Sequence, residues 1–289
     1  MKYIDVSEWQ GVIDWEKVKD AVDGAIIRAG RAQGVSDPYW ERNVSECNRL
    51  GIPCGAYWFS EAYTVDMARA EAAAFLAAVR PYRMELPLAY DFEEYAIAKI
   101  KKLHGVTVTR KLATDMLYAF CEKLEDGGYW ALAYTNPSCI KQYLSDAVFQ
   151  RFGLWLAYWP TAAYPAVKPR ADCQIWQWGG SIIPGITVKA ADGSIATVDT
   201  NESYVDFRKI IADAGMNRLA AKPPASAPHP APALDALAWA RQHDLCGDVT
   251  PDATVTWAEL AEALRLLCTG KEETYDPDYN RASGLLTDD

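Results

Sequence analysis

Two carboxylates follow a short apolar stretch at residues 86–92. The stretch has the character of a buried strand, and Asp91 and Glu93 stand two positions apart at its end. Side chains alternate between the faces of a strand, so both carboxylates are expected to point the same way. Repulsion between neighbouring carboxylates raises the pKa of one of them, which keeps it protonated near neutral pH as a general acid. A strand that runs into a solvated acidic loop has the same spacing. The spacing alone therefore does not distinguish a catalytic pair of carboxylates from such a loop.

Apolar segments predict eight strands, at 2–7, 25–29, 54–60, 86–92, 130–134, 153–159, 173–178 and 195–199. Helical patterns at 14–22, 38–50, 64–79 and 107–124 separate the first five, and two more lie at 138–144 and 204–214. This order indicates an α/β fold, a closed parallel TIM-like (β/α) barrel that is irregular because helices are missing between its last strands. Chemistry in such barrels takes place at the C-terminal ends of the strands. Asp5, Asp91, Glu93 and Asp199 fall near predicted strand ends, which favours one shared site.

The chain divides by composition into three segments. Residues 1–217 form the predicted barrel, and 218–233 form a linker rich in proline and alanine. Residues 234–289 contain two helical patterns and are predicted to be a small acidic helical module. That module holds 4 basic and 12 acidic side chains, so it carries most of the formal net charge of −10.

Composition excludes several classes of protein. Neither the barrel nor the module offers the basic field that nucleic acids require, and no apolar run reaches the length of a membrane span. The seven cysteines are odd in number and scattered, so we expect reduced, mostly buried thiols without a metal site. His104 is the only histidine of the barrel and has no motif around it, which argues against a Ser-His-Asp or Cys-His site. No cofactor motif is present. The N-terminus has no signal-peptide pattern, so we expect synthesis in the cytoplasm and action elsewhere only after release.

Several motifs along residues 1–217 together resemble one known family. They are Ile4-Asp5-Val6-Ser7-Glu8-Trp9-Gln10-Gly11, Ile26-Ile27-Arg28-Ala29-Gly30, Gly55-Ala56-Tyr57-Trp58-Phe59-Ser60, Tyr90-Asp91-Phe92-Glu93, Tyr134-Thr135-Asn136, Leu154-Trp155-Leu156-Ala157, Trp176-Gln177-Trp178 and Val198-Asp199-Thr200-Asn201. The chain is similar in these motifs to family 25 glycoside hydrolases, the N-acetylmuramidase type of lysozyme common in phage endolysins. The resemblance implies hydrolysis of the β-1,4 bond between N-acetylmuramic acid and N-acetylglucosamine in bacterial peptidoglycan.

The resemblance also implies roles for four acids. Glu93 matches the general acid, and Asp91 matches the second acid, which stabilises oxocarbenium charge or orients the substrate's N-acetyl group. Asp5 and Asp199 match two further acids of the cleft. Structural alternatives are an ion pair of Asp5 with Arg28 and a helix cap made by Asp199. Asp206 follows closely as a rival for the fourth acid, and the Val-Asp-x-Asn pattern favours Asp199.

Candidate substrate-binding residues are Arg28, Tyr57, Tyr134, Trp155 and Trp176. We expect Arg28 to be a charge partner of the acids rather than a direct ligand. Each aromatic ring could stack on a sugar or could equally belong to the core. The stereochemistry of the reaction, whether retaining, inverting or assisted by the substrate's N-acetyl oxygen, stays open.

The C-terminal segment weakly resembles a single S-layer-homology-like repeat, although Trp257 stands where that family usually has a basic residue. Wall binding and formation of a homo-oligomer are both open for this module. Two other functions remain to be distinguished from a lysozyme. One is a chitinase-like glycosidase, which Ala89 disfavours because that motif carries a further acid two residues before Asp91. The other is a catalytically inactive wall-binding barrel.

Overall fold

The computed structural model describes residues 1–159, 169–188 and 194–219. The predicted acidic module, and the predicted linker apart from Arg218 and Leu219, lie outside these residues. Within the described ranges, no helix is long and apolar enough to cross a membrane. The cysteines of these ranges are free and buried, as predicted: Cys47, Cys54, Cys121, Cys139 and Cys173.

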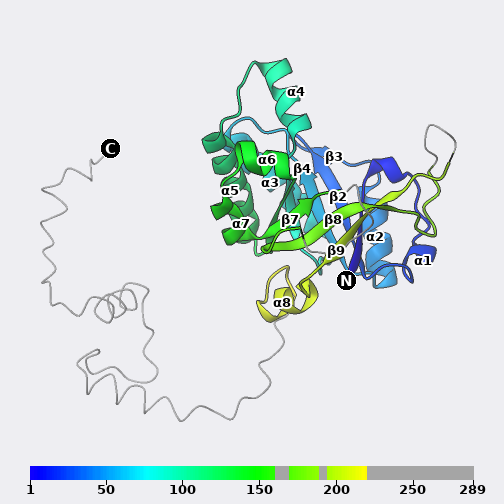
Figure 1. Cartoon of the computed structure of the whole chain (residues 1–289). Coiled ribbons are helices and arrows are strands. Elements are labelled where there is room, and N and C mark those ends of the chain that lie inside the picture. Colours follow the sequence, from blue (N-terminus) through cyan, green and yellow to red (C-terminus); the bar gives the residue numbers. More distant parts are fainter. Residues whose placement is uncertain (160–168, 189–193, 220–289) are drawn as a thin grey trace, which may run out of the picture. The chain divides into compact units, whose positions relative to one another are not determined.

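The strands form a closed barrel (Figure 1). Its strands, in spatial order, are β1 (Lys2–Val6), β9 (Val198–Ser203), β8 (Cys173–Ser181), β7 (Leu154–Ala157), β6 (Ala131–Thr135), β5 (Leu88–Asp91), β4 (Cys54–Phe59) and β2 (Gly24–Arg31). Pairing of β1 with β2 closes the circle. The short strand β3 (Val35–Ser36) is an antiparallel extension of β2. The predicted α/β barrel is therefore confirmed.

The last strand differs from the prediction of an all-parallel barrel. β9 runs antiparallel to both of its neighbours, β1 and β8. Its first residues therefore lie at the same end of the barrel as the C-terminal ends of the parallel strands. Asp199, the second residue of β9, stands directly opposite Asp5 near the C-terminal end of β1. The reversal of the strand brings Asp199 to the predicted end of the barrel by a route that the sequence prediction did not include.

Strand alternation divides the core into two layers. Inside the barrel, one cluster includes Tyr3, Ile26, Ala89, Leu132 and Ile175, all nearly inaccessible to solvent. The intervening strand residues point outward and join a larger cluster with the helices. Most of the inner cluster fills the barrel toward the N-terminal ends of the strands. Toward the other end, polar residues share the inward positions with the rings of Tyr134 and Trp155.

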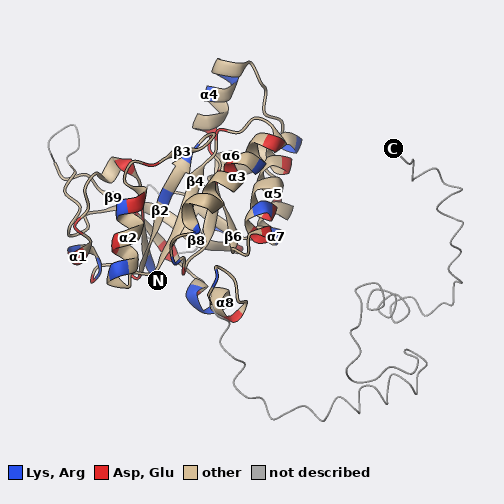
Figure 2. Ribbon diagram, turned by 180° about the vertical axis from the view of Figure 1, so that it is seen from behind, with Lys and Arg blue, Asp and Glu red and all other residues tan. Residues whose placement is uncertain are grey.

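Most helices lie on the outside of the barrel, and two lie at its ends (Figure 1). The helices are α1 (Trp15–Val18), α2 (Trp40–Leu50), α3 (Val65–Val79), α4 (Glu94–His104), α5 (Arg110–Asp126), α6 (Pro137–Tyr143), α7 (Asp146–Phe152) and α8 (Phe207–Asp213). Of these, α4 and α8 lie at the upper and lower ends of the barrel in Figure 1. Charged residues lie mainly on the helices and the loops (Figure 2). Thr64 and Thr109 cap α3 and α5 by accepting hydrogen bonds from backbone N–H groups of the first turn. The predictions missed α4 and α7, whose N-cap residues are Glu93 and Ser145.

Glu71 is a fully buried carboxylic acid on α3. Its carboxyl oxygens accept hydrogen bonds from Ser60 Oγ at 2.6 Å and Gln33 Nε2 at 2.8 Å. Burial nevertheless raises the pKa of Glu71 from 4.5 to about 7. Because the folded chain binds this proton more tightly than the unfolded chain, the stabilisation is complete below about pH 4.5 and is lost as the pH rises through about 7. The loss is on the order of 3 kcal/mol.

We expect Glu71→Gln to weaken the decline in stability between about pH 5 and about pH 8, because the amide does not titrate. The Gln side chain keeps an oxygen that accepts from Gln33 and gains an N–H that donates to Ser60. Thermal unfolding of wild type and variant across this range measures the effect. Glu41→Gln, at an exposed position of α2, is the matched control and should follow wild type. Parallel curves for all three proteins would contradict the prediction.

Candidate active site

Four acids meet in one pocket at the C-terminal end of the barrel. Asp5 and Asp199 are register partners on β1 and β9. Asp91 is the last residue of β5, and Glu93 follows it at the position that caps α4. The pocket has a volume of about 210 Å³ and is lined by Asp5, Val6, Ser7, Trp9, Gln10, Arg28, Tyr57, Phe59, Asp91, Glu93, Tyr134, Trp155 and Asp199. Residues from strands β1, β2, β4, β5, β6, β7 and β9 therefore build one acidic site.

The pKa values of all four carboxyl groups are raised. Burial is the main cause for Asp91, followed by the charges of Glu93 and Asp5. Burial also raises the pKa of Glu93, and a hydrogen bond from Tyr134 opposes this change. The pKa of Asp5 rises to about 6 through burial, although hydrogen bonds from Asn201 and Gln177 lower it. The pKa of Asp199 rises to about 8, through burial and then repulsion by Asp5 and Glu93. The site therefore holds protons near neutral pH.

Asp91 and Glu93 differ in their access to the pocket. Asp91 is 4 % exposed, and its Oδ1 atom is buried without a hydrogen-bond partner among the described residues. Glu93 is half-buried. A buried carboxyl oxygen without a hydrogen-bond partner costs free energy, and such atoms are uncommon in folded proteins. Its presence here favours a functional role for Asp91. Of these two acids, Glu93 is the more accessible to a bound molecule, and Asp91 lies deeper.

Gln177 connects the acid pair to the aromatic wall. Its Nε2 atom donates to Asp5 Oδ2 at 3.1 Å and reaches Asp199 Oδ2 at 3.5 Å. Its Oε1 atom accepts from the hydroxyl of Tyr134 and from Nε1 of Trp159, both at 3.2 Å. Two donors on one oxygen fix the orientation of the amide and direct its N–H groups to the acids. Tyr134 has one proton to share between Gln177 and Glu93, so it couples the two sides of the site.

Asn201 holds the same acid from the next strand. Its Nδ2 atom donates to Asp5 Oδ2 at 2.8 Å, and its Oδ1 atom accepts from Nε1 of Trp155 at 2.7 Å. Asn201 is fully buried. Asp5 is thus fixed by two amides, which favour its charged form against burial.

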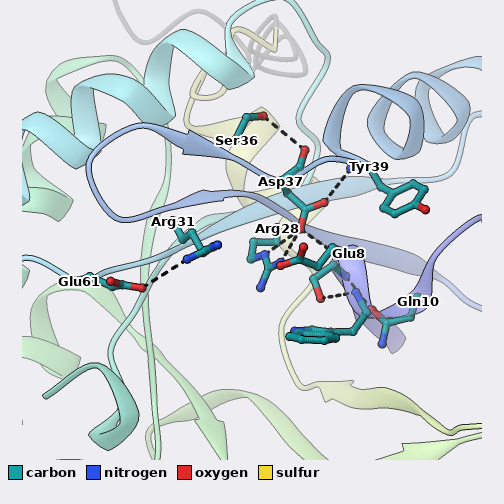
Figure 3. Close-up of polar contacts among 10 residues, drawn as sticks. Glu8, Gln10, Arg28, Arg31, Ser36, Asp37, Tyr39 and Glu61 are labelled. Carbon is teal, nitrogen blue, oxygen red and sulfur yellow. Dashed lines mark hydrogen bonds and ion pairs between the residues drawn. The ribbon is translucent and has the colours of Figure 1, made fainter. Parts of the chain in front are cut away.

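Arg28 has different partners from those expected. It donates to Glu8 Oε1 at 2.6 Å and to Asp37 Oδ2 at 2.8 Å (Figure 3). The alternative in which Asp5 pairs with Arg28 is wrong, because the described partners of Asp5 are the two amides. Arg28 still lines the pocket, and its charge lowers the pKa of Asp91. It therefore acts on the acids through space while Glu8 and Asp37 hold it in position.

Three of the four predicted aromatic residues line the pocket: Tyr57, Tyr134 and Trp155. The ring of Trp155 makes edge contacts with both tyrosines, with centroids 6.2 Å and 4.6 Å apart. The prediction that Trp176 belongs to the substrate-binding residues is not supported by its position. It belongs to the outer cluster facing the helices, and its Nε1 donates to the carbonyl of Tyr158 at 2.7 Å. It is not among the residues that line the pocket.

The fourth acid is Asp199 rather than Asp206. Asp206 caps α8 by accepting a hydrogen bond from the backbone N–H of Lys209 at 3.1 Å. This is the capping role that had been an alternative for Asp199. Asp199 lines the acid pocket.

Sequence reasoning did not select several residues of this site. Gln177 and Asn201 stand inside motifs that carried the resemblance, but only the aromatic and acidic members were considered as candidates. Trp9 lines the pocket and is 73 % exposed, which is unusual for a side chain of its size. It lies in the 3-10 helix η1 (Glu8–Gln10), directly after β1. A tryptophan next to a predicted strand end was the signal available in the sequence.

Most of the barrel is similar to one known protein family. The family model described as glycosyl hydrolases family 25 matches residues 4–186, which span the barrel from β1 to beyond β8. The chain belongs to this family. A curated relative, the uncharacterized protein YegX of Escherichia coli K12, is 34% identical over 107 residues. That match covers 35% of this chain and 38% of YegX, so the chain spans well under half of this relative.

Solved structures of family 25 and of lytic enzymes share the fold. A family 25 glycosyl hydrolase from Bacillus anthracis has a TM-score of 0.57 at 24% identity, covering 73% of this chain and 92% of that one. The autolysin LytC from Streptococcus pneumoniae has a TM-score of 0.56 at 26% identity, covering 69% and 46%. The CTP1L endolysin has a TM-score of 0.55 at 21% identity, covering 73% and 68%. These three structures therefore share the fold of this chain.

Proposed function

We propose that the protein is a lysozyme that hydrolyses the β-1,4 bond between N-acetylmuramic acid and N-acetylglucosamine in bacterial peptidoglycan. The observation that carries this proposal is the group of four carboxyl groups with raised pKa values in one pocket at the C-terminal end of the barrel. Membership of family 25 supports glycoside hydrolysis. A structure of LytC in complex with a synthetic peptidoglycan ligand supports the substrate class.

Glu93 is the general acid of this proposal. Burial raises its pKa, which favours the protonated form that a general acid needs, and its half-buried position lets it reach the glycosidic oxygen. Cleavage transfers this proton to the leaving sugar while positive charge develops on the other sugar ring. Ionised Asp5 stabilises that charge across the pocket. After transfer, the hydroxyl of Tyr134 stabilises the Glu93 carboxylate.

Asp91 orients the substrate from the deeper part of the pocket. Its carboxyl group lines the pocket beside Glu93, and the N-acetyl amide is the polar group that the proposed substrate offers to it. An N-acetyl group held in this way can act as the nucleophile through its own oxygen. Neighbouring acids with the spacing of Asp91 and Glu93 suit this substrate-assisted route, and direct attack or water activation are the alternatives.

Digestion of purified cell walls, followed by mass spectrometry of the fragments, tests the proposal. New reducing ends at N-acetylmuramic acid support it. Reducing ends at N-acetylglucosamine would contradict the bond assignment and leave a glycosidase, and hydrolysis of chitin oligomers would favour the chitinase-like alternative. Binding to walls without release of fragments would identify an inactive wall-binding barrel.

The biological setting belongs to the same proposal. The CTP1L endolysin and other lytic enzymes share the fold, which supports a phage endolysin that acts on the host cell wall after release from the cytoplasm. Retention of the protein inside cells that express it alone, and its release when a membrane-permeabilising protein is added, would support this role. Lysis of cells that express this chain alone would contradict it.

Trp9 provides the test of substrate stacking. Its exposed ring lies in the pocket wall, so a sugar ring bound there would cover it. We expect Trp9→Ala to raise the KM for soluble wall fragments about tenfold, with little change in kcat, because stacking stabilises bound substrate and transition state alike. Tyr204→Ala is the control, since Tyr204 is exposed just beyond the C-terminal end of antiparallel β9, away from the acids. A fall in kcat at unchanged KM would argue against stacking.

A further inference from the structure

A second pocket lies at the opposite end of the barrel from the acids. It has a volume of about 890 Å³ and forms between the loop that joins α3 to β5, helix α8 and the turn that follows α8. Its lining residues are Arg80, Pro81, Tyr82, Arg83, Glu85, Asp206, Arg208, Lys209, Ala212, Asn217, Arg218 and Leu219. Asn217 Nδ2 donates to the carbonyl of Leu86, just before β5, which fixes this pocket at the N-terminal ends of the strands.

Positive charge is concentrated in this pocket. Its lining contains five cationic side chains, Arg80, Arg83, Arg208, Lys209 and Arg218, and two acids, Glu85 and Asp206. All five cationic residues are exposed. Basic positions are visible on α8 at the lower end of the barrel (Figure 2). Residues 1–233 carry a formal net charge of only −2, with 25 basic and 27 acidic side chains, so an excess of positive charge in one pocket of this segment indicates an anionic ligand. We call this pocket the basic pocket.

A single carboxylate holds two of the guanidinium groups. Glu85 Oε1 accepts from Arg83 Nη2 at 3.1 Å and from Arg208 Nη2 at 3.3 Å. The side chain of Glu85 is 12 % exposed, whereas those of Arg83 and Arg208 are 67 % and 55 % exposed. One negative charge shared by two guanidinium groups leaves a net positive charge. Each guanidinium has five N–H donors, so both can bind Glu85 and still offer donors toward the pocket.

The turn after α8 is held in an uncommon conformation. Asn217 and Arg218 have φ values of 55° and 60°, in the left-handed region that costs a residue other than glycine about 1 kcal/mol or more. Asn217 is buried, its Oδ1 accepts from the backbone N–H of Trp130 at 2.7 Å, and its own N–H donates to Gly128 at 2.8 Å. Arg218 Nη1 donates to the carbonyl of Arg80 at 2.6 Å. These bonds fix Arg218 at the edge of the basic pocket.

We propose that the basic pocket binds a phosphodiester polymer of the cell wall, a chain of polyol units joined by phosphates. Arginine matches phosphate because its planar fork donates two parallel hydrogen bonds to phosphate oxygens. Cations spread along a wide, open pocket suit a flexible chain with repeated charges better than one small anion. Nucleic acid is a poorer fit, because bases stack on aromatic side chains and Tyr82 is the only aromatic residue among the described residues that line the pocket. The choice of a wall polymer rests on the proposed function, whereas the phosphodiester chemistry rests on the pocket alone.

Binding of the full-length protein to a soluble, lipid-free poly(glycerol phosphate) chain tests this proposal without any hydrolysis. The pocket variant combines Arg80→Gln with Lys209→Gln. The matched control combines Arg69→Gln with Lys111→Gln, two exposed cations on α3 and α5 that do not line the basic pocket. Both variants remove two positive charges, so long-range attraction changes equally in both. Only the pocket variant removes direct contacts to phosphate.

We expect fluorescence anisotropy to show that the pocket variant weakens binding about tenfold and the control less than about twofold. The salt dependence of the affinity should become shallower in the pocket variant, and walls stripped of phosphate polymers should not compete. Inorganic phosphate should displace the polymer better than chloride at equal ionic strength. Equal losses in both variants, no binding by wild type, or equally tight binding of a DNA strand with the same number of phosphates would overturn the proposal.

A folding defect is checked by thermal unfolding of each variant. If the pocket variant is destabilised, Lys209→Gln alone provides the same test, because the side chain of Lys209 is 68 % exposed and pairs with Asp213 one helical turn away. Unchanged affinity of this folded single variant would also overturn the proposal. Failure of wall hydrolysis with retained polymer binding would refute the lysozyme activity and leave the basic pocket intact.

Discussion

Glu93→Gln is expected to reduce peptidoglycan hydrolysis by about 10³-fold, because the amide cannot deliver a proton to the glycosidic oxygen. Glutamine keeps the shape of the side chain and an oxygen that accepts from Tyr134, so the pocket should keep its form. Release of reducing sugars from purified walls, at saturating substrate, measures the effect. KM should change little, because the proton is required in the transition state and not for binding.

Glu94→Gln is the matched control for this experiment. Glu94 is the adjacent residue and begins α4, and it accepts a hydrogen bond from Asn136 Nδ2 at 2.7 Å. An equal loss of activity in Glu94→Gln would show that the helix start, and not the general acid, accounts for the defect. If Glu93→Gln retained near wild-type activity, Asp91 would become the candidate acid, because its pKa is also raised.

The pH dependence of wild-type hydrolysis follows from the same groups. In the proposed mechanism, activity requires protonated Glu93 and ionised Asp5. The alkaline limb therefore reflects loss of the Glu93 proton, at a pH above the ordinary range of a glutamate. The acid limb reflects protonation of Asp5, near pH 6. Both limbs lie closer to neutrality than those of exposed carboxyl groups because burial penalises the charged forms.

The barrel could be predicted from the sequence because its parallel strands are continuous apolar runs separated by amphipathic helices. The reversed direction of β9 could not be predicted in this way. Apolar periodicity carries no information on strand direction, and the reversal depends on pairing with β1 and β8. Asp199 was therefore placed at the correct end of the barrel for an incorrect reason.

The acids of the site were easier to predict than its amides. A carboxylate at a strand end is conspicuous in an apolar sequence, whereas Gln177 between two tryptophans resembles an ordinary surface position. Alternation indicates that Trp176 and Gln177 face opposite sides of β8, but the sequence does not indicate which side is inside. The partners of Arg28 were missed for a similar reason, because Glu8 in η1 and Asp37 after β3 meet only in the folded barrel. Helix α4 was a different case, since buried Ala96, Ile97 and Ile100 have helical spacing that could have been recognised.

Gln177→Met is expected to reduce kcat/KM by on the order of 10²-fold, although Gln177 transfers no proton in the proposed reaction. Methionine fills a similar volume and removes the amide that Asp5 and Asp199 share. Hydrogen bonds to charged groups contribute about 1.5–3 kcal/mol each, and their buried partners are left unsatisfied. The hydroxyl of Tyr134 also loses its acceptor on Gln177, which frees it to bond with Glu93.

The pH profile distinguishes this positioning role from general damage to the fold. The hydrogen bond from Gln177 lowers the pKa of Asp5, so its removal raises that pKa above about 6 and moves the acid limb of the profile to higher pH. A stronger hydrogen bond from Tyr134 lowers the pKa of Glu93, which moves the alkaline limb to lower pH. The profile should therefore become narrower from both sides. Gln174→Met, on the same strand but outside the acid pocket, should leave both limbs in place. A uniform loss of activity with unchanged limbs would show that Gln177 supports the barrel without tuning its acids.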